Sequence, residues 1–500
     1  MNTRLLALCF ALLTSLPPAA LAQSTYGAVV GVANDSTGAA LPGASVTLTE
    51  VQTAFARTGT TDDTGAFEFQ NLTQGLYRLE VELSGFRKFT TEPFRVEARQ
   101  TVRADARLVV GGVAEQVTVR SGASLINTET PTVAGKVDNR ELQQLPFTFR
   151  TQNTSPIPAI QAIPEVQRVG QQFSLSGALP YQTEVSVDGI LTTSVRRNGI
   201  GAEGVNVFPS IESIEEIKVS SVSNTAEYSQ LGDITTISKP GTNQFHGTAF
   251  YNFNDTGLNA NPNYFNKSVA PNQSDNSNYG FSIGGPVVRG RTFFFGTFER
   301  LDISRTQSAA ATVPSAAFRD GDFSAVATPI LDPATGLPFA GNRIPTGRIN
   351  PVSAKLLQTF IPAPNDGTSI HRYSIDGSEV SNQFDIRMDQ NFSAGHTLFG
   401  RFSRKKVDTL APTTFESLGP RTDEKPNHTL VISDNYAIRP NLLNEARFGV
   451  TAADQTFTTG QRGIEMISDL GLTLLSTNPP DVTGTPAVQI AGYTNFGESQ

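Results

Sequence analysis

Seven segments in the second half of the chain alternate apolar and polar residues with a period of two, which is typical of β-strands whose two faces meet different surroundings. Each segment is close to the ~9–11 residues that a tilted strand needs to cross a membrane. The seven segments are 246–253, 278–285, 292–303, 382–390, 397–406, 427–437 and 444–452.

The connections between these segments alternate strictly between long and short. The long connections are 254–277, 304–381 and 407–426, and the short ones are 286–291, 391–396 and 438–443. A membrane β-barrel has short turns on its periplasmic side and long loops outside. A soluble sandwich has no reason to sort its connections in this way. The order therefore predicts an antiparallel transmembrane β-barrel whose first strand begins at His246 and runs outward.

The hairpin NQFDIRMDQNFSAGHTLFGRFS illustrates the choice between membrane and soluble folds. In a soluble hairpin the apolar face lies on a core and the charged face in water. In a membrane barrel the apolar face meets lipid and the charged face meets a wet lumen. Given the order of the connections, the residues expected to face lipid are Phe384, Ile386 and Met388, and those expected to face the lumen or a plug inside it are Asp385, Arg387 and Asp389.

The N-terminus has the three parts of a secretory signal peptide. Arg4 lies in a short positive region, an apolar run follows at 5–16, and Ala20 and Ala22 fit an A-x-A cleavage site. A membrane anchor is the alternative, but the run is short for a spanning helix and is followed by two prolines. We therefore expect a signal peptide at 1–22 and a mature chain that starts at Gln23. Cys9, the only cysteine, would be removed with it.

Residues 23–110 contain short alternating strands separated by turn signals, which predicts a compact β-sandwich. The stretches GALPGASVTL, TTDDTGAFEFQNLTQGLYRLEV and SGF resemble the carboxypeptidase regulatory-like domain, and this resemblance implies a transthyretin-like sandwich rather than a peptidase. Asp62 and Asp63 precede Gly65, and we interpret them as acidic turn residues instead of calcium ligands.

Residues 111–245 mix helix and strand patterns and predict an α/β domain. A short helix is expected at 137–145, a strand at 184–190, and a helix-like turn that continues into a strand at 211–221. Near the start of this region, an acidic residue is followed by alternating Val-Thr-Val in EQVTVR. That segment has two interpretations: a short extended segment that a partner binds by strand addition, or the plain first strand of the next domain.

The main resemblance lies in the same region. The stretches VDGI, PSIESIEEIKVSSVSNTAEYS and TTISKPGTNQFHGTAFY look like the plug-to-barrel passage of TonB-dependent outer-membrane receptors of the Oar-like group. The sequence departs from the family pattern after Tyr228, where only Gly232 remains of a glycine-rich run, and in the proline-rich stretch 151–165. The resemblance identifies the TonB-box candidate as Glu115, Gln116, Val117, Thr118 and Val119.

This resemblance implies a plug at 111–245, a barrel from 246 to 500, and ligand uptake driven by a TonB-type energy-transducing protein. Family members take up iron chelates, cobalamin, saccharides or peptides. It also implies an outer-membrane location, contact with outer-membrane lipid, and an N-terminal domain and plug on the periplasmic side. Seven or eight strands cannot enclose a plug of roughly 130 residues, because plugged barrels have on the order of 22 strands. We therefore expect an incomplete barrel and an N-terminal part of a longer receptor.

Other functions receive little support from the residues. The formal charge of −8 argues against a nucleic-acid partner. The four histidines form no close ligand cluster, and H-E-x-x-H and G-x-x-x-x-G-K motifs are absent from the sequence. The stretch GFSIG at 280–284 fits G-x-S-x-G, but it lies within an expected strand and not at the strand-to-helix turn of a nucleophile elbow. We expect no enzyme, no cofactor and no metal. Two alternatives stay open: an adhesion or surface-structure protein with a non-transporting barrel, and a secreted all-β binding protein.

Overall fold

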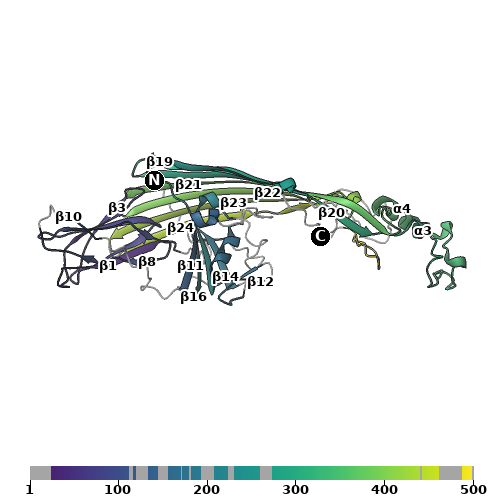
Figure 1. Cartoon of the computed structure of the whole chain (residues 1–500), viewed down its shortest axis with the longest axis horizontal. Helices are drawn as coiled ribbons and strands as arrows, with labels where there is room; N and C mark the ends of the chain where they lie inside the picture. Colours follow the sequence, from purple (N-terminus) through teal and green to yellow (C-terminus); the bar gives the residue numbers. More distant parts are fainter. Residues whose placement is uncertain are drawn as a thin grey trace, which may run out of the picture.

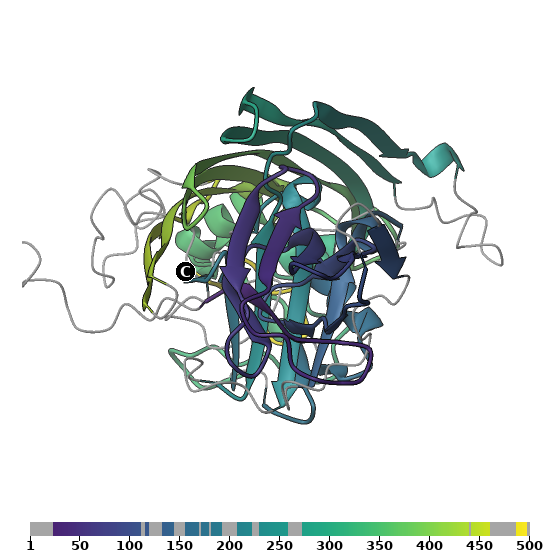
Figure 2. The same ribbon diagram turned by 90° about the vertical axis from the view of Figure 1, so that its left-hand side faces the viewer.

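Three β-rich parts make up the described chain: a sandwich, a middle domain within 133–238 that we call the plug after the expectation from sequence, and one wide curved sheet (Figure 1). The computed structural model describes residues 24–111, 116–119, 133–144, 156–169, 172–179, 182–192, 208–222, 230–258, 273–439, 442–460 and 487–497. Viewed from the end, the curved sheet arches over the plug and the sandwich (Figure 2). Within these ranges, no helix is both long enough and apolar enough to cross a membrane.

The sandwich packs two sheets face to face, one ordered β4-β1-β8 with β9 beside β1, the other β10-β6-β5-β2-β3 with β7 beside β5. Its strands are β1 (Gly27–Asn34), β2 (Ser45–Glu50), β3 (Ala56–Thr60), β4 (Ala66–Leu72), β5 (Gly75–Glu82), β6 (Lys88–Thr91), β7 (Phe94–Val96), β8 (Thr101–Arg103), β9 (Ala106–Arg107) and β10 (Gln116–Val119). Alternate residues of β1 and β5 point inward, so that Val29, Leu79 and Val81 are fully buried in the core. The predicted β-sandwich is confirmed.

Two acidic turns close strands of this sandwich. The Asp35 Oδ1 atom accepts hydrogen bonds from the backbone N–H groups of Thr37 (2.8 Å) and Ala39 (2.9 Å). The Asp62 Oδ1 atom accepts in the same way from Thr64 (2.8 Å) and Ala66 (2.9 Å). Each carboxylate satisfies turn N–H groups directly, which is the role that Asp residues have in such turns. The hydrogen bonds from Thr64 and Ala66 also lower the pKa of the Asp62 carboxyl.

Strand β10 joins the sandwich from beyond the expected boundary at residue 110. It pairs in parallel with β6, with Gln116 opposite Lys88 and Val119 opposite Thr91. It is the last strand of its sheet, so its second edge has no strand beside it in the described chain.

The plug is built on a sheet ordered β11-β16-β17-β14-β15, in which only β14 and β17 run parallel. Its elements are β11 (Val133–Asp138), α2 (Asn139–Gln144), the 3₁₀ helix η1 (Ile157–Ala162), the hairpin β12 (Val166–Val169) and β13 (Gln172–Leu175), β14 (Thr183–Val187), β15 (Ile190–Leu191), the 3₁₀ helix η3 (Ile211–Ser213), β16 (Ile214–Val222) and β17 (Gly232–Ser238). Apolar residues of β11, β14, β16 and β17 pack with η1 and η3 into one core.

The helix expected at 137–145 is shorter than predicted. Val137 and Asp138 belong to β11, where they pair with Ile217 and Glu216 of β16, and α2 begins at Asn139. Pairing with a neighbouring strand therefore overrides the local helical pattern at these two positions.

The curved sheet contains the seven predicted strands and one short extra strand, all antiparallel to their neighbours. They are β18 (His246–Asn254), β19 (Gln273–Val288), β20 (Thr292–Thr312), β21 (Ile370–Ser393), β22 (His396–Ala411), β23 (Arg421–Arg439), β24 (Leu442–Ala453) and β25 (Thr456–Thr458). Several strands are longer than the alternation predicted. Strand β18 at one edge and β24 toward the other do not meet, so the sheet is open within the described chain, in agreement with the incomplete barrel that we expected.

Short turns and long connections lie at opposite ends of this sheet (Figure 1). The short turns 289–291 and 394–395 lie at the end that carries the sandwich. At the far end, connection 313–369 contains α3 (Ala316–Arg319), η5 (Ala340–Asn342), η6 (Thr346–Arg348) and α4 (Pro351–Phe360), and connection 412–420 contains η7 (Glu416–Leu418). Phe360, Phe415, Leu418 and Phe496 form a small separate apolar core there.

Candidate functional site

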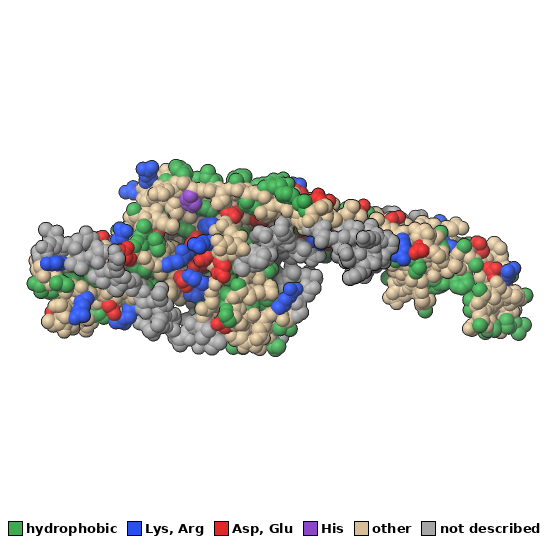
Figure 3. Space-filling view, in the orientation of Figure 1, with side chains coloured by type: hydrophobic (Ala, Val, Ile, Leu, Met, Phe, Trp, Pro, Cys, Tyr) green, Lys and Arg blue, Asp and Glu red, His purple; other side chains and the backbone are tan. Residues whose placement is uncertain are grey.

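The hairpin of β21 and β22 separates apolar and charged side chains on its two faces. Phe384, Ile386 and Met388 are 38%, 45% and 49% exposed on the convex face, where hydrophobic side chains gather along the sheet (Figure 3). Asp385 and Arg387 are 4% and 5% exposed on the concave face, which packs against the plug. Asp389 lies on the same concave face and pairs with Arg387 at 2.7 Å.

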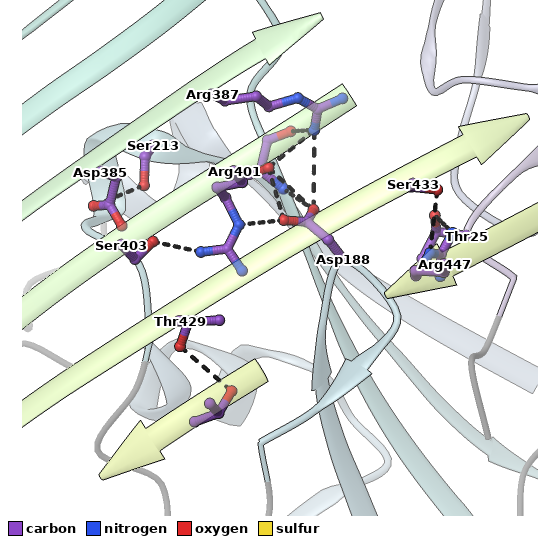
Figure 4. A network of polar contacts seen from close by, with 12 residues as sticks. Thr25, Asp188, Ser213, Asp385, Arg387, Arg401, Ser403, Thr429, Ser433 and Arg447 are labelled. Carbon is purple, nitrogen blue, oxygen red and sulfur yellow. Dashed lines mark hydrogen bonds and ion pairs between the residues drawn. The ribbon is translucent and has the colours of Figure 1, made fainter. Parts of the chain in front are cut away.

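A plug carboxylate lies between two arginines of the barrel sheet (Figure 4). Asp188 and Gly189 form the turn between β14 and β15, with φ of +49° and +76°. Arg401 Nε lies 2.5 Å from Asp188 Oδ2, and Arg387 Nη1 lies 3.9 Å from Asp188 Oδ1. The Ser238 backbone N–H donates to Asp188 Oδ1 at 2.9 Å. One plug turn is thus fixed to the wall by ionic contacts.

The barrel sheet makes this carboxylate necessary. Arg387 and Arg401 are directly opposite each other on β21 and β22, and like charges in that position are destabilising. Both guanidinium groups are also nearly fully buried. Burial opposes ionisation of Asp188, but the Arg401 and Arg387 charges and the Ser238 hydrogen bonds outweigh it and lower the pKa of the carboxyl. Asp188 is therefore ionised at neutral pH and places one negative charge between the two arginines, while Asp389 gives Arg387 a second carboxylate partner.

A second contact joins the start of η3 to the same wall. Ser210 Oγ donates to Glu299 Oε2 at 2.6 Å, and the Ser210 backbone N–H donates to Asp385 Oδ2 at 3.0 Å. Thr297 Oγ1 also lies 3.1 Å from Asp385 Oδ2. The Ser210 hydroxyl further accepts from the Glu212 backbone N–H at 3.3 Å, so it caps the 3₁₀ turn while it binds the barrel.

The sandwich also binds the barrel, close to its short turns. Asn71 and Asn435 exchange two hydrogen bonds of 3.0 Å, one of them through the Asn71 carbonyl oxygen. Arg447 Nη2 donates to Thr25 Oγ1 at 3.2 Å (Figure 4). Tyr26 Oη lies 3.3 Å from Ser433 Oγ. These contacts hold the sandwich at the end of the sheet that carries the short turns.

The remaining predicted site residues are placed only in part. Gln116, Val117, Thr118 and Val119 form β10, whereas Glu115 lies outside the described residues. Ala20, Ala22 and Gln23 of the expected cleavage site also lie outside them. Within the described ranges, no group of three His, Cys, Asp or Glu side chains is arranged to hold a metal ion.

The contacts of Arg401, Ser210 and Glu299 between the plug and the barrel were not predicted from the sequence. Arg401 alternates with Leu398, Gly400 and Phe402, so the pattern assigned it to the concave face but did not indicate its partner. The cross-strand pairing of Arg387 with Arg401 would have required a buried anion nearby. Asp188 lies in the VDGI stretch that carries the family resemblance, and it forms a tight turn there with Gly189.

Comparison with known proteins agrees with this architecture. The sequence matches the model of the outer membrane beta barrel domain over residues 237–500 and that of the carboxypeptidase regulatory-like domain over residues 28–109. It is 23% identical over 280 residues to the TonB-dependent transporter Oar of Myxococcus xanthus, covering 53% of this chain and 26% of that protein.

Two solved structures show limited similarity. The ferric enterobactin receptor PfeA of Pseudomonas aeruginosa, in the form of a point mutant, matches with 13% identity and a TM-score of 0.38 over 65% of this chain and 44% of that one. The outer membrane transporter YddB of Escherichia coli matches with 13% identity and a TM-score of 0.38 over 63% and 38%. The chain spans about a quarter of the length of the curated relative that it matches. It belongs to the outer membrane β-barrel family, and a carboxypeptidase regulatory-like domain precedes the barrel.

Proposed function

We propose that the protein takes up a ligand across the outer membrane through a plug-gated barrel. The observation that carries this proposal is the nature of the contact between plug and wall. The plug has its own apolar core, and it meets the barrel through Asp188, Ser210 and their charged or polar partners. Such contacts can be exchanged for water without exposing that core, so the plug can move as a unit.

The orientation in the membrane follows from the two faces and the two ends of the sheet. Phe384, Ile386 and Met388 face lipid, and Asp385, Arg387 and Asp389 face the plug. The short turns lie on the periplasmic side, as in other membrane barrels. The sandwich and the plug are then periplasmic, and connection 313–369 is the external surface that meets a ligand first.

The energy source is a TonB-type partner that binds the segment 115–119. Strand β10 supports this proposal because it is extended and lies at the edge of its sheet. An edge strand offers unpaired backbone groups to an incoming strand. The partner would pull on this segment and shift the plug, without any catalytic step, cofactor or metal. The transported ligand belongs to one of three classes: saccharide, peptide or iron chelate.

The test uses the full-length receptor with Val117→Pro, and with Val117→Ala as the matched control. Proline removes a backbone donor and disturbs strand pairing, whereas alanine keeps the backbone N–H. We expect the proline variant to lose binding to the purified periplasmic domain of a TonB-type protein. We also expect it to lose growth on whichever saccharide, peptide or iron chelate supports the wild type as limiting nutrient.

The alternatives give different results in the same experiment. If the proline variant binds the partner and supports growth like the alanine variant, segment 115–119 is not the energy-coupling site. If no nutrient depends on the receptor but cell-surface attachment does, the protein is an adhesin. Recovery in the soluble fraction without detergent would contradict the outer-membrane proposal altogether.

A further inference from the structure

The sandwich contacts the plug as well as the barrel, and one arginine dominates that contact. Arg99 lies in the turn between β7 and β8 with φ of +56° and extends into the plug sheet. Its guanidinium pairs with Asp233, and it donates to Ser220 Oγ at 2.6 Å and to Thr235 Oγ1 at 3.1 Å. A backbone conformation that L residues rarely adopt is thus held at the position that inserts.

The plug surface that receives Arg99 is a polar face in the middle of its sheet. Ser220 of β16 and Thr235 and Asp233 of β17 are between 0% and 1% exposed. The register places Ser220 opposite Asp233, and Thr235 opposite Ser186 of β14. A buried aspartate in such a layer requires a compensating cation. The sandwich supplies that cation in Arg99.

The residues beside Arg99 extend the same contact through the backbone. The Ala98 N–H donates to Glu216 Oε1 at 2.9 Å, and Lys218 Nζ donates to the Ala98 carbonyl oxygen at 2.6 Å. Farther out, Arg95 Nη2 lies 2.6 Å from Glu215 Oε1. Strand β16 therefore carries acidic and basic side chains that contact both β7 and the turn that follows it.

The other side of the sandwich is fixed to the barrel. Besides the Asn71–Asn435 contact, the Asn243 backbone N–H donates to the Gln52 carbonyl oxygen at 3.1 Å, and the Asn243 Oδ1 atom accepts from the Gly290 N–H at 2.8 Å. Gly290 lies in the short turn between β19 and β20. The sandwich thus bridges the plug and the end of the barrel sheet, and a plug that moves must break one of the two attachments.

We propose that the sandwich restrains the plug inside the barrel, and that Arg99 is the positioning residue that attaches the sandwich to the plug. This inference rests on the proposed plug-gated uptake, and it adds a second release step to it. A pull on 115–119 would have to detach the sandwich from the plug, or from the barrel, before the plug can shift.

The first experiment measures the attachment in the purified full-length receptor in detergent. Spin labels are placed on exposed residues of the sandwich and the plug through Asp63→Cys and Glu141→Cys. We expect one narrow distance distribution, which Arg99→Ala broadens and Arg99→Lys retains. Arg103→Ala is the control, because Arg103 pairs with Asp105 on the exposed surface of the sandwich. An unchanged distribution in the Arg99→Ala variant would overturn the proposal.

The second experiment asks whether the sandwich restrains the plug. Asn71→Cys and Asn435→Cys are joined by a short thiol crosslinker, and urea is raised until a protease cleaves the plug. We expect crosslinking to raise the urea midpoint when Arg99 is present, and Arg99→Ala to remove that increase. If the crosslink leaves the urea midpoint unchanged, the sandwich does not restrain the plug.

Neither measurement needs a TonB-type partner or a transported ligand. If the proposed transport is wrong, both results still stand. If the sandwich does not restrain the plug, the Val117→Pro test is unaffected. Cys9 is the only cysteine in this sequence and lies in the expected signal peptide, so the engineered thiols react alone within these 500 residues.

Discussion

Replacing Asp188 by asparagine should loosen the plug strongly. The substitution keeps the side-chain shape but removes the charge between Arg401 and Arg387, which lie opposite each other and are nearly fully buried. Removing one partner of a buried ion pair costs about 3–5 kcal/mol. The lower value, about 3 kcal/mol, applies because Arg387 retains Asp389 and Arg401 retains the Ser403 hydroxyl.

The assay is pulse proteolysis of the full-length receptor in urea, with the cleaved plug fragments quantified by mass spectrometry and the barrel as internal reference. With a slope of roughly 1.5 kcal/mol per molar urea, a loss of about 3 kcal/mol lowers the plug midpoint by about 2 M. Asp63→Asn, in an exposed turn of the sandwich, is the matched control and should change stability by less than about 0.5 kcal/mol. If Asp188→Asn behaves like this control, the ion pairs of Asp188 with Arg401 and Arg387 do not hold the plug.

Three further changes have defined outcomes. Because the pKa of Asp188 is lowered, its contribution to plug stability is fully present above the ordinary value of 3.8 and is lost as pH falls through the folded-state value. At pH values below about 4, the urea midpoint of the plug should therefore decrease, and it should decrease less in the Asp188→Asn variant. Ser210→Ala removes the donor to buried Glu299 and should cost about 1–3 kcal/mol in the same assay. Ile386→Lys on the convex face should cost about 2–4 kcal/mol of membrane insertion, seen as less heat-modifiable folded receptor on gels, whereas Asp366→Lys in an exposed loop should insert normally.

The seven barrel strands could be predicted from sequence because lipid imposes a strict alternation on each strand. The ends of the strands could not. Strand β20 continues from Ile303 to Thr312 through SRTQSAAAT, where the residues are small or polar and show no apolar period. Pairing with 370–379 of β21, and at 304–306 also with 273–275 of β19, extends it, and such pairing is not visible in a local pattern.

The same reasoning explains which contacts were missed. Period-two alternation places Arg387 and Arg401 on the concave face, but the register that sets them opposite each other depends on turn 394–395. The η3 turn and β16 were predicted from IESIEEIKVSS, because a cap and a strand are both local. The insertion of Arg99 into the plug joins residues more than a hundred positions apart, and nothing near Arg99 in the sequence indicates it.

The most direct test of the account is the conductance of the full-length receptor in a planar lipid bilayer. The plug is held by polar contacts, whereas the barrel strands are joined by long backbone ladders, so urea should release the plug first. We predict no steady current without urea, open channels in several molar urea, and closure when the urea is washed out. Channels that stay open without urea, or a receptor that never conducts, would contradict the account of a barrel closed by a removable plug.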